Sequence, residues 1–190
     1  QSALVDAVYL STDSAEIADV ARAHGCEVPF LRATELANDE VTSIDVVCDA
    51  LDRFPPHDIW LLLQPTSPLR TVEDLDGVVA TMERTGIDSC VSVTEAQDHP
   101  WLTYAIVDDG AMTRFCTDDP AHAARRQDMP PAYVLNGAVY GFRPYWLRQG
   151  RAFVDAKSST TSRISSAQRR YGGRPQRALR RAVDLRRNIL

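Results

Sequence analysis

The sequence predicts an α/β domain with a mainly parallel β-sheet. Short apolar runs alternate with segments of helical periodicity along the first half of the 190-residue chain. Helices of about 10 to 14 residues between strands imply right-handed crossovers, which place successive strands side by side and parallel. The run at 59–63 is apolar at every position, which is typical of a strand covered on both faces.

The first strand is expected at residues 6–12 (DAVYLST) and the first helix at about 14–24. Asp13 followed by Glu16 resembles a capping box, in which two side chains bind the free N–H groups of the first turn. Gly25 suits the position after the helix, where a left-handed backbone is common.

Two further helices begin with a threonine followed three residues later by an aspartate. These capping boxes are Thr42 with Asp45 and Thr71 with Asp74. The first of the two helices runs to the Pro55-Pro56 break, and the second closes at Gly86. Strands are expected at 59–63 and 89–94.

Beyond about residue 95 the pattern changes. The stretch WLTYAIVDDGAMTRF predicts two strands joined by Asp109-Gly110, a dipeptide typical of tight hairpin turns. A polar stretch, HAARRQDMPPAY, and a short apolar strand, NGAVYGF, follow. We therefore expect a domain over residues 1–156 that carries a small β-hairpin excursion at about 97–135.

Charge is divided unevenly along the chain. Residues 1–156 hold 25 acidic and 11 basic side chains, whereas 157–190 hold 10 basic and 1 acidic. The basic segment is rich in Ser, Arg and Gly and poor in residues that form cores, so its composition predicts disorder or nucleic-acid binding. We favour a disordered or atypical tail over a nucleic-acid-binding arm.

The composition also excludes several classes. No run reaches the roughly 20 apolar residues of a membrane span, and the start lacks the basic-then-apolar order of a signal peptide. We therefore expect a cytoplasmic protein without a membrane partner. The four cysteines have no paired spacing, which favours reduced, mostly buried thiols, and the four histidines show no metal spacing.

Polar residues at strand ends and in loops are the candidates for chemistry. They are Asp13, Arg32, Ser43, the run from Gln64 to Arg70, Arg125 to Gln127, and Asn136-Gly137. Pro65 and Pro68 end the strand at 59–63, which puts the polar run at the C-terminal edge of the sheet, where open parallel sheets bind ligands. Arginine side chains and helix N-termini together favour an anionic ligand.

Each candidate also has a purely structural interpretation. Asp13 and Ser43 can be helix caps, and each arginine can be a solvated surface charge. Asn136-Gly137 can be only a turn. No single residue decides between the two interpretations.

Four segments, taken together in their order along the chain, are more informative than any single residue. They are LSTDSAEIADVARAHGCEVPFLRATELANDEVTSIDVVCDAL, LLLQPTSPLRTVEDLD, DSCVSVTEAQDHPWL and RRQDMPPAYVLNGAVYGF. These segments, which cover about residues 5–147, resemble the acylneuraminate cytidylyltransferase family, also called CMP-sialic acid synthetases. The resemblance implies a Rossmann-like fold of the nucleotide-diphospho-sugar transferase type, with the hairpin excursion serving homodimerisation.

The resemblance also implies a nucleotidyltransferase reaction. CMP would pass from CTP to a nine-carbon α-keto acid sugar, sialic acid or a related nonulosonate, with release of pyrophosphate and commonly with Mg²⁺. Arg32 and Ser43 would contact the nucleotide. The residues implied at the sugar are Gln64, Arg126 toward its carboxylate or acyl group, Asn136 and Tyr140. No catalytic residue or metal ligand is assigned.

Two patterns of that family are not found in the 190 residues. One is an early strand and loop of the type IPARGGSKGxxxKN, which wraps the CTP phosphates, and the other is a late SIDID-like segment whose carboxylates bind the metal. Loss of the early strand would leave a gap in the sheet, with unpaired backbone groups along the neighbouring strand.

Three alternatives therefore stand beside the main expectation. The chain can be a catalytically impaired fragment of such an enzyme, or a non-catalytic module that binds nucleic acid or an acidic partner through its basic tail. It can also be a relative that acts on the eight-carbon keto acid of bacterial lipopolysaccharide, although RRQDMPPAYVLNGAVY resembles the acylneuraminate branch more closely.

Overall fold

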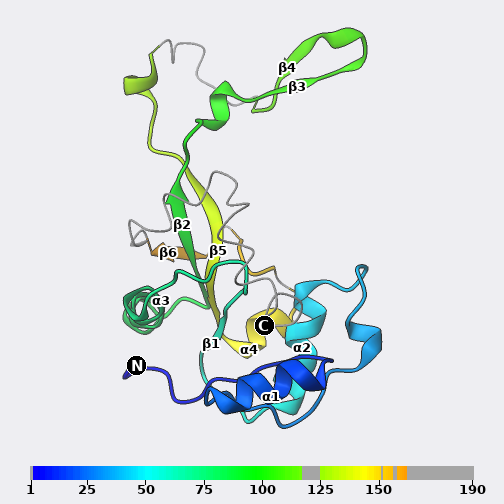
Figure 1. Cartoon of the computed structure of the whole chain (residues 1–190). Helices are drawn as coiled ribbons and strands as arrows, with labels where there is room; N and C mark the ends of the chain where they lie inside the picture. The colour runs from blue at the N-terminus through cyan, green and yellow to red at the C-terminus, as the bar shows by residue number, and fades with distance from the viewer. Residues whose placement is uncertain (1, 117–124, 151, 156–157, 162–190) are drawn as a thin grey trace. The chain divides into compact units, whose positions relative to one another are not determined.

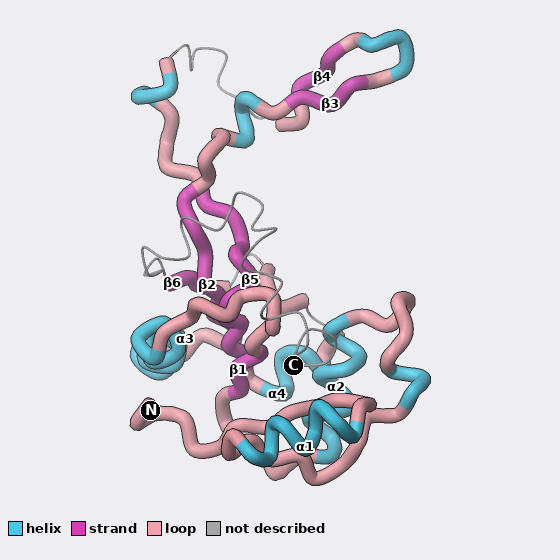
Figure 2. Tube along the Cα trace, in the orientation of Figure 1, coloured by secondary structure: helices cyan, strands magenta, loops and turns pink. Residues whose placement is uncertain are grey.

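The computed structural model describes residues 2–116, 125–150, 152–155 and 158–161. Its helices are α1 (Ala15–Ala23), α2 (Ser43–Arg53), α3 (Val72–Thr85) and α4 (Pro144–Arg148). Its strands are β1 (Trp60–Leu62), β2 (Ser89–Glu95), β3 (Tyr104–Ile106), β4 (Met112–Arg114), β5 (Tyr133–Phe142) and β6 (Ser159–Thr161). Short 3₁₀ turns occur at Thr34–Leu36, Pro100–Leu102, Asp108–Gly110 and Arg126–Asp128 (Figures 1 and 2).

The strands form one sheet of four, in the order β1-β5-β2-β6, and a separate sheet of β3 and β4. β1 pairs antiparallel with β5, and β6 pairs parallel with β2. The chain leaves the larger sheet along β2 and returns along β5 (Figure 1), so only β5 runs against the common direction. The predicted α/β class with a mainly parallel sheet is confirmed.

Two compact units make up the chain. One contains the described residues up to Val93 and those from Asn136 to Thr161, and the other contains the described residues of Thr94–Leu135. The second unit holds the predicted hairpin, in which Tyr104 lies opposite Arg114 and Ile106 opposite Met112. Asp109 and Gly110 both have positive φ angles, 79° and 82°, as the Asp-Gly turn signal predicts.

Two of the three predicted capping boxes are present. In α2 and α3 the side chains of Thr42 and Thr71 each accept a hydrogen bond from the N–H three residues later. The aspartate side chain at that later position accepts a hydrogen bond from the backbone N–H of the threonine. The prediction for α1 is wrong: its N-cap is Ser14, which accepts from the N–H of Ile17. Ser14 stands one residue closer to the helix, so it reaches the first turn and Asp13 is free to point elsewhere.

The strand expected at residues 6–12 is reduced to a single parallel bridge between Tyr9 and Glu27. The N–H of Leu10 donates to the carbonyl of Glu27, and the N–H of Glu27 donates to the carbonyl of Val8. These bonds use one edge only of the extended segment. Among the described residues no backbone hydrogen bond joins its other edge to a strand, so a full ladder does not form.

Helices cover the run at 59–63 on both of its faces, as the sequence predicts. Trp60 and Leu62 pack on a cluster that includes Val47 of α2 and Trp146 of α4. The alternate residues of the run, Ile59, Leu61 and Leu63, pack on a second cluster with Val78 and Met82 of α3. Side chains alternate across a strand, so this run joins two layers of the core.

Part of the expected tail belongs to the sheet. Ser159–Thr161 forms β6 beside Cys90–Ser92, because these β-compatible residues can extend the ladder of a buried strand. Residues 162–190, on which the nucleic-acid alternative rests, lie outside the described residues. Within the described part of the chain, no helix is long and apolar enough to cross a membrane.

We predict that Gly141→Ala destabilises the protein whereas Gly77→Ala does not. A methyl group at Gly141 would overlap Val78 Cγ1 and lie 2.9 Å from Met82 Sδ, both on α3. Overpacking of this kind costs about 1–3 kcal/mol. Gly77 lies within α3 with nothing inside 4 Å of the added methyl, so alanine there should stabilise by about 0.5–1 kcal/mol. Urea unfolding of both variants measures the difference; equal midpoints would contradict it.

Candidate functional site

The polar run after β1 forms a tightly held turn. The carbonyl oxygen of Gln64 accepts a hydrogen bond from the N–H of Ser67, at 3.2 Å, and a second one from Nη2 of Arg70. Pro65 and Pro68 cannot donate to a ladder, so the strand ends and the chain turns toward α3. The two bonds to one carbonyl hold this loop against the end of β1.

The first part of β5 lies at the same end of the sheet because β5 runs antiparallel to β1. Leu62 pairs with Tyr140, so the residues that follow β1 lie beside the residues that precede Tyr140 in β5. The hydroxyl of Ser67 donates to the carbonyl of Asn136, at 3.4 Å. This bond ties the loop to β5.

Gln64, Gly137 and Tyr140 meet at this point. A methyl group built on Gly137 would lie 2.8 Å from Gln64 Oε1 and 3.9 Å from Tyr140 Oη. The φ angle of Gly137 is +70°, a conformation that side chains other than glycine rarely adopt. Both the positive φ and the close approach of the Gln64 carboxamide therefore require glycine here.

Asn136 is fixed by Ser92 of β2. Its Oδ1 accepts from the Ser92 hydroxyl at 2.7 Å and from the N–H of Ala138 at 3.0 Å. Ser92 Oγ in turn accepts from the N–H of Val139, at 2.9 Å. Asn136 Nδ2 is buried and has no hydrogen-bond partner among the described residues, so it is a donor available to a ligand.

Arg70 places a positive charge at this edge of the sheet. Burial lowers the pKa of its guanidinium to about 10, and the nearby Asp74 carboxylate opposes that shift. A pKa of about 10 still leaves the side chain charged at neutral pH. Its Nε is buried and has no hydrogen-bond partner within the described ranges.

Arg32 is held beside Asp13 rather than in solvent. Its side chain is only 8% exposed, and its Nη2 lies 3.8 Å from Asp13 Oδ1. The N–H of Arg32 donates to the carbonyl of Thr12 at 2.7 Å, which docks this segment against the start of α1. The interpretations of Asp13 as a helix cap and of Arg32 as a solvated charge are both wrong.

Ser43 is the first residue of α2 and is exposed, whereas Thr42 is the N-cap. Its interpretation as a cap is therefore wrong as well. The hydrogen bonds from Thr42 to Asp45 lower the pKa of that carboxyl group. A helix N-terminus with a free hydroxyl suits a phosphate or ribose, although Ser43 is not part of the Gln64 cluster.

The second unit contains the remaining candidates. Arg126 begins the short turn Arg126–Asp128, and its side chain lies outside the described part of the structure. Arg125 forms an exposed ion pair with Asp128, at 2.9 Å, which fits its structural interpretation. The structure thus brings together Gln64, Asn136 and Tyr140 of the predicted site.

Sequence reasoning missed Ser92, which orients Asn136. The available signal was a serine between Val91 and Val93 of a predicted strand, because a buried hydroxyl needs a partner. Ser92 is 4% exposed. Within the described residues there is no group of three or more His, Cys, Asp or Glu side chains that could hold a metal ion.

The fold is similar to that of two solved enzymes. One is a solved structure of CMP:2-keto-3-deoxy-manno-octonic acid synthetase complexed with CTP. The match covers 86% of this chain and 75% of the synthetase chain, with a TM-score of 0.58 and 14% sequence identity. The 4-diphosphocytidyl-2C-methyl-D-erythritol synthase from Anaerococcus prevotii matches 85% and 74%, with a TM-score of 0.56 and 13% identity. These likenesses confirm the predicted Rossmann-like fold.

The chain belongs to the cytidylyltransferase family, whose model, described as "Cytidylyltransferase", matches residues 1–181. The N-acylneuraminate cytidylyltransferase of Streptococcus agalactiae serotype V is 30% identical over 161 residues, covering 85% of this chain and 37% of the relative. The CMP-N,N'-diacetyllegionaminic acid synthase of Legionella pneumophila is 34% identical over 153 residues, covering 74% and 61%. The chain thus spans between about a third and three fifths of the length of these relatives.

We predict that Ser92→Ala destabilises the fold by about 1–3 kcal/mol, because it leaves the buried N–H of Val139 without its acceptor and Asn136 Oδ1 without one donor. Ser43→Ala is the matched control, since Ser43 is exposed. Thermal unfolding of both variants measures the effect. A Ser92→Ala protein as stable as the control would show that Asn136 is held by other contacts.

Proposed function

We propose that this protein transfers CMP from CTP to a nine-carbon α-keto acid sugar of the sialic acid type and releases pyrophosphate. The observation that carries the proposal is the convergence of Gln64, Asn136 and Tyr140 at one end of the sheet. A carboxamide, an amide N–H pair without a partner among the described residues, and a phenol are donors and acceptors that suit a polyhydroxylated ring. Family membership and the names of the relatives support the choice of CTP and of this sugar class.

In the proposed reaction, the anomeric hydroxyl oxygen of the sugar attacks the α-phosphorus of CTP. The new P–O bond forms as the bond to pyrophosphate breaks, and the hydroxyl proton is released. Reactions of this kind depend mainly on holding the two reactants in line. Gln64 and Asn136 would orient the sugar, and the contact of Arg126 with a sugar carboxylate or acyl group stays a prediction from the family resemblance.

Nucleotide contacts are proposed for Arg32 and Ser43. Arg32 presents a buried guanidinium whose charge is partly matched by Asp13. Ser43 stands at the N-terminus of α2, where free N–H groups favour an anion. Both positions suit recognition of a nucleotide, and neither residue supplies a base or a nucleophile.

Mg²⁺ is a proposed co-reactant, and the described residues do not form a site for it. Without a cluster of three or more suitable side chains among them, no step is assigned to a protein-bound metal. Mg²⁺ is commonly held by substrate phosphates together with one or two carboxylates, so it belongs in the assay as the partner of CTP.

We predict that the protein releases pyrophosphate only when CTP, Mg²⁺ and an acid sugar are all present. The panel is sialic, legionaminic and pseudaminic acids and the eight-carbon keto acid. Gln64→Ala should lower kcat/KM by about threefold to tenfold, the value of one neutral hydrogen bond. Gly137→Ala should lower it further, because the methyl group would displace the Gln64 carboxamide.

Gly150→Ala is the control for Gly137→Ala, because Gly150 also has a positive φ, +72°, but has no atom within 4 Å of the added methyl. Equal losses in the two variants would mean that backbone strain, and not the Gln64 contact, is responsible. A folded protein that binds a sugar without releasing pyrophosphate would support the impaired-fragment alternative. If no sugar of the panel is bound and none leads to pyrophosphate release, the proposed function is overturned.

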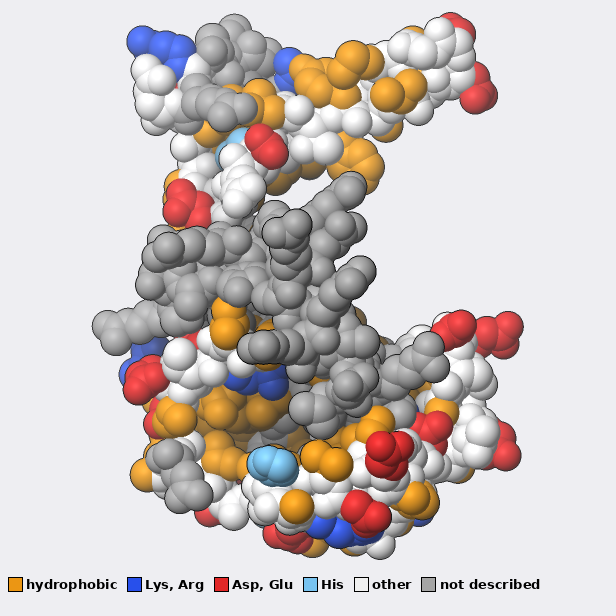
Figure 3. Space-filling model, viewed as in Figure 1, with side chains coloured by type: hydrophobic (Ala, Val, Ile, Leu, Met, Phe, Trp, Pro, Cys, Tyr) orange, Lys and Arg blue, Asp and Glu red, His pale blue; other side chains and the backbone are white. Residues whose placement is uncertain are grey.

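We also propose that the second unit forms a homodimer contact. Its exposed large apolar side chains include Tyr104, Ile106, Val107, Met112, Phe115, Tyr133, Val134 and Leu135. Ile106 is 77% exposed and faces Met112, which is 64% exposed, across the hairpin. Figure 3 shows hydrophobic side chains gathered over this region. A two-stranded hairpin is marginal in water, so a covering partner would stabilise it.

We predict that Ile106→Lys shifts the protein from dimer to monomer in sedimentation velocity experiments. The buried charge would oppose association, since charged residues are depleted at interface centres. Val20→Lys, on the exposed side of α1 in the other unit, is the control and should leave the dimer unchanged. A wild-type protein that is monomeric at all concentrations tested would contradict the proposal.

A further inference from the structure

The side-chain amide of Asn136 is held in one orientation. Its Oδ1 accepts a hydrogen bond from the backbone N–H of Ala138, at 3.0 Å. A backbone N–H can only donate, so the end of the amide that faces it must be the oxygen and not the nitrogen. The Ser92 hydroxyl donates to the same oxygen, at 2.7 Å. These two bonds fix which end of the amide is the acceptor.

The hydrogen bonds of Ser92 agree with this orientation. Ser92 Oγ accepts from the N–H of Val139 at 2.9 Å, so its own proton is available to donate. The acceptors within reach are Asn136 Oδ1, at 2.7 Å, and the carbonyl of Val139, at 3.2 Å. A reversed Asn136 amide would set its N–H groups against the N–H of Ala138, which no rotation of the Ser92 hydroxyl could relieve.

The two ends of the Asn136 amide therefore differ in what they can still bind. A carboxamide oxygen has two lone pairs, and Ala138 and Ser92 use both. Nδ2 carries two N–H donors, is buried and has no hydrogen-bond partner among the described residues. Buried polar groups are nearly always paired, so this nitrogen calls for an acceptor.

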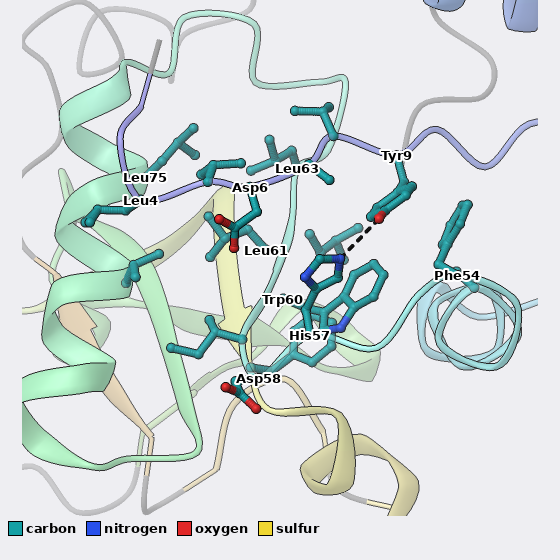
Figure 4. A pocket seen from close by; sticks show the side chains of 18 of the residues that line it. Leu4, Asp6, Tyr9, Phe54, His57, Asp58, Trp60, Leu61, Leu63 and Leu75 are labelled. Carbon is teal, nitrogen blue, oxygen red and sulfur yellow. Dashed lines mark hydrogen bonds between the residues drawn. The ribbon is translucent and has the colours of Figure 1, made fainter. Parts of the chain in front are cut away.

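The cavity beside β1 does not supply that acceptor. It has a volume of about 650 Å³, and Figure 4 shows Leu63 and Tyr9 among the residues around it. None of Gln64, Asn136 and Tyr140 belongs to its lining, although Gln64 directly follows Leu63. The partner of Asn136 Nδ2 is therefore to be sought in a ligand at the Gln64 cluster.

The free end of the amide sets the chemistry of that ligand group. A hydroxyl group can pair with both ends of a carboxamide, since it accepts from the nitrogen and donates to the oxygen. At Asn136 the oxygen is already filled, so a hydroxyl bound at Nδ2 would find no acceptor for its proton in this amide. A carboxylate or acyl carbonyl oxygen has no proton to place and suits a site that only donates.

We propose that Asn136 is a specificity-determining residue, which donates through Nδ2 to a carboxylate or acyl carbonyl oxygen of the sugar. The inference rests on the proposed function, because it concerns the same sugar site. It adds the polarity of the contact: Asn136 recognises an acceptor, and Ala138 and Ser92 impose that polarity.

The test is calorimetric titration of the full chain with N-acetylneuraminic acid, with CTP present and Mg²⁺ left out so that the sugar binds without reacting. Asn136→Asp keeps an oxygen for Ala138 and Ser92 and replaces Nδ2 by an acceptor. We expect it to raise the Kd of the sugar at least about tenfold, because a hydrogen bond is replaced by two acceptors facing each other.

Asn38→Asp is the matched control. Asn38 is exposed, and its Oδ1 also accepts from two backbone N–H groups, those of Glu40 and Val41. Its Nδ2 already donates to the carbonyl of Glu35, at 2.8 Å. The same substitution there should leave the Kd of the sugar unchanged.

Two analogues of the sugar distinguish the sources of the oxygen. In one, a hydroxyl group replaces the acylamino group, and in the other the carboxylate is reduced to a primary alcohol. The analogue that lacks the oxygen bound by Asn136 should bind the wild type and Asn136→Asp with equal Kd, whereas the other analogue should keep the difference of about tenfold. A full difference with both analogues would overturn the proposal.

A second measurement does not require the variant to fold. In wild-type protein labelled with ¹⁵N at asparagine, the sugar should shift the side-chain signals of Asn136, and one of the two analogues should not. Equal Kd values for the wild type and a folded Asn136→Asp, or Asn136 signals unmoved by a bound sugar, would overturn this inference alone. If the wild type binds no sugar, the proposed function is overturned and this inference with it.

Discussion

The antiparallel pairing of β1 with β5 is the interaction on which the rest of the structure depends. Its register sets Leu62 opposite Tyr140, and from that register follows the meeting of the Gln64 loop with Asn136 and Gly137. The same pairing joins the two apolar clusters, because side chains of β1 alternate between them. A shift of one residue in the β1–β5 register would turn each side chain of β1 to the opposite face of the sheet. The same shift would move the Gln64 loop away from Asn136 and Gly137.

Hydrogen bonds then fix the side chains and loop that the pairing of β1 with β5 brings together. Ser92 holds Oδ1 of Asn136, while the buried Nδ2 has no hydrogen-bond partner among the described residues. Arg70 and Ser67 hold the carbonyl of Gln64, which leaves the Gln64 carboxamide to face Gly137. The chain thus uses buried hydrogen bonds to position the groups that we propose bind the sugar, and such positioning is what an in-line transfer requires.

The sequence by itself determined the local structure. Capping boxes at Thr42 and Thr71, the Asp-Gly turn and the apolar run at 59–63 act over a few residues, so their signals predict the elements correctly. Only the tertiary structure decided that Asp13 pairs with Arg32, that Ser92 holds Asn136, and that β1 ends the sheet. These outcomes depend on partners distant in the chain, and the order and register of strands that bring them together are not encoded in any one segment.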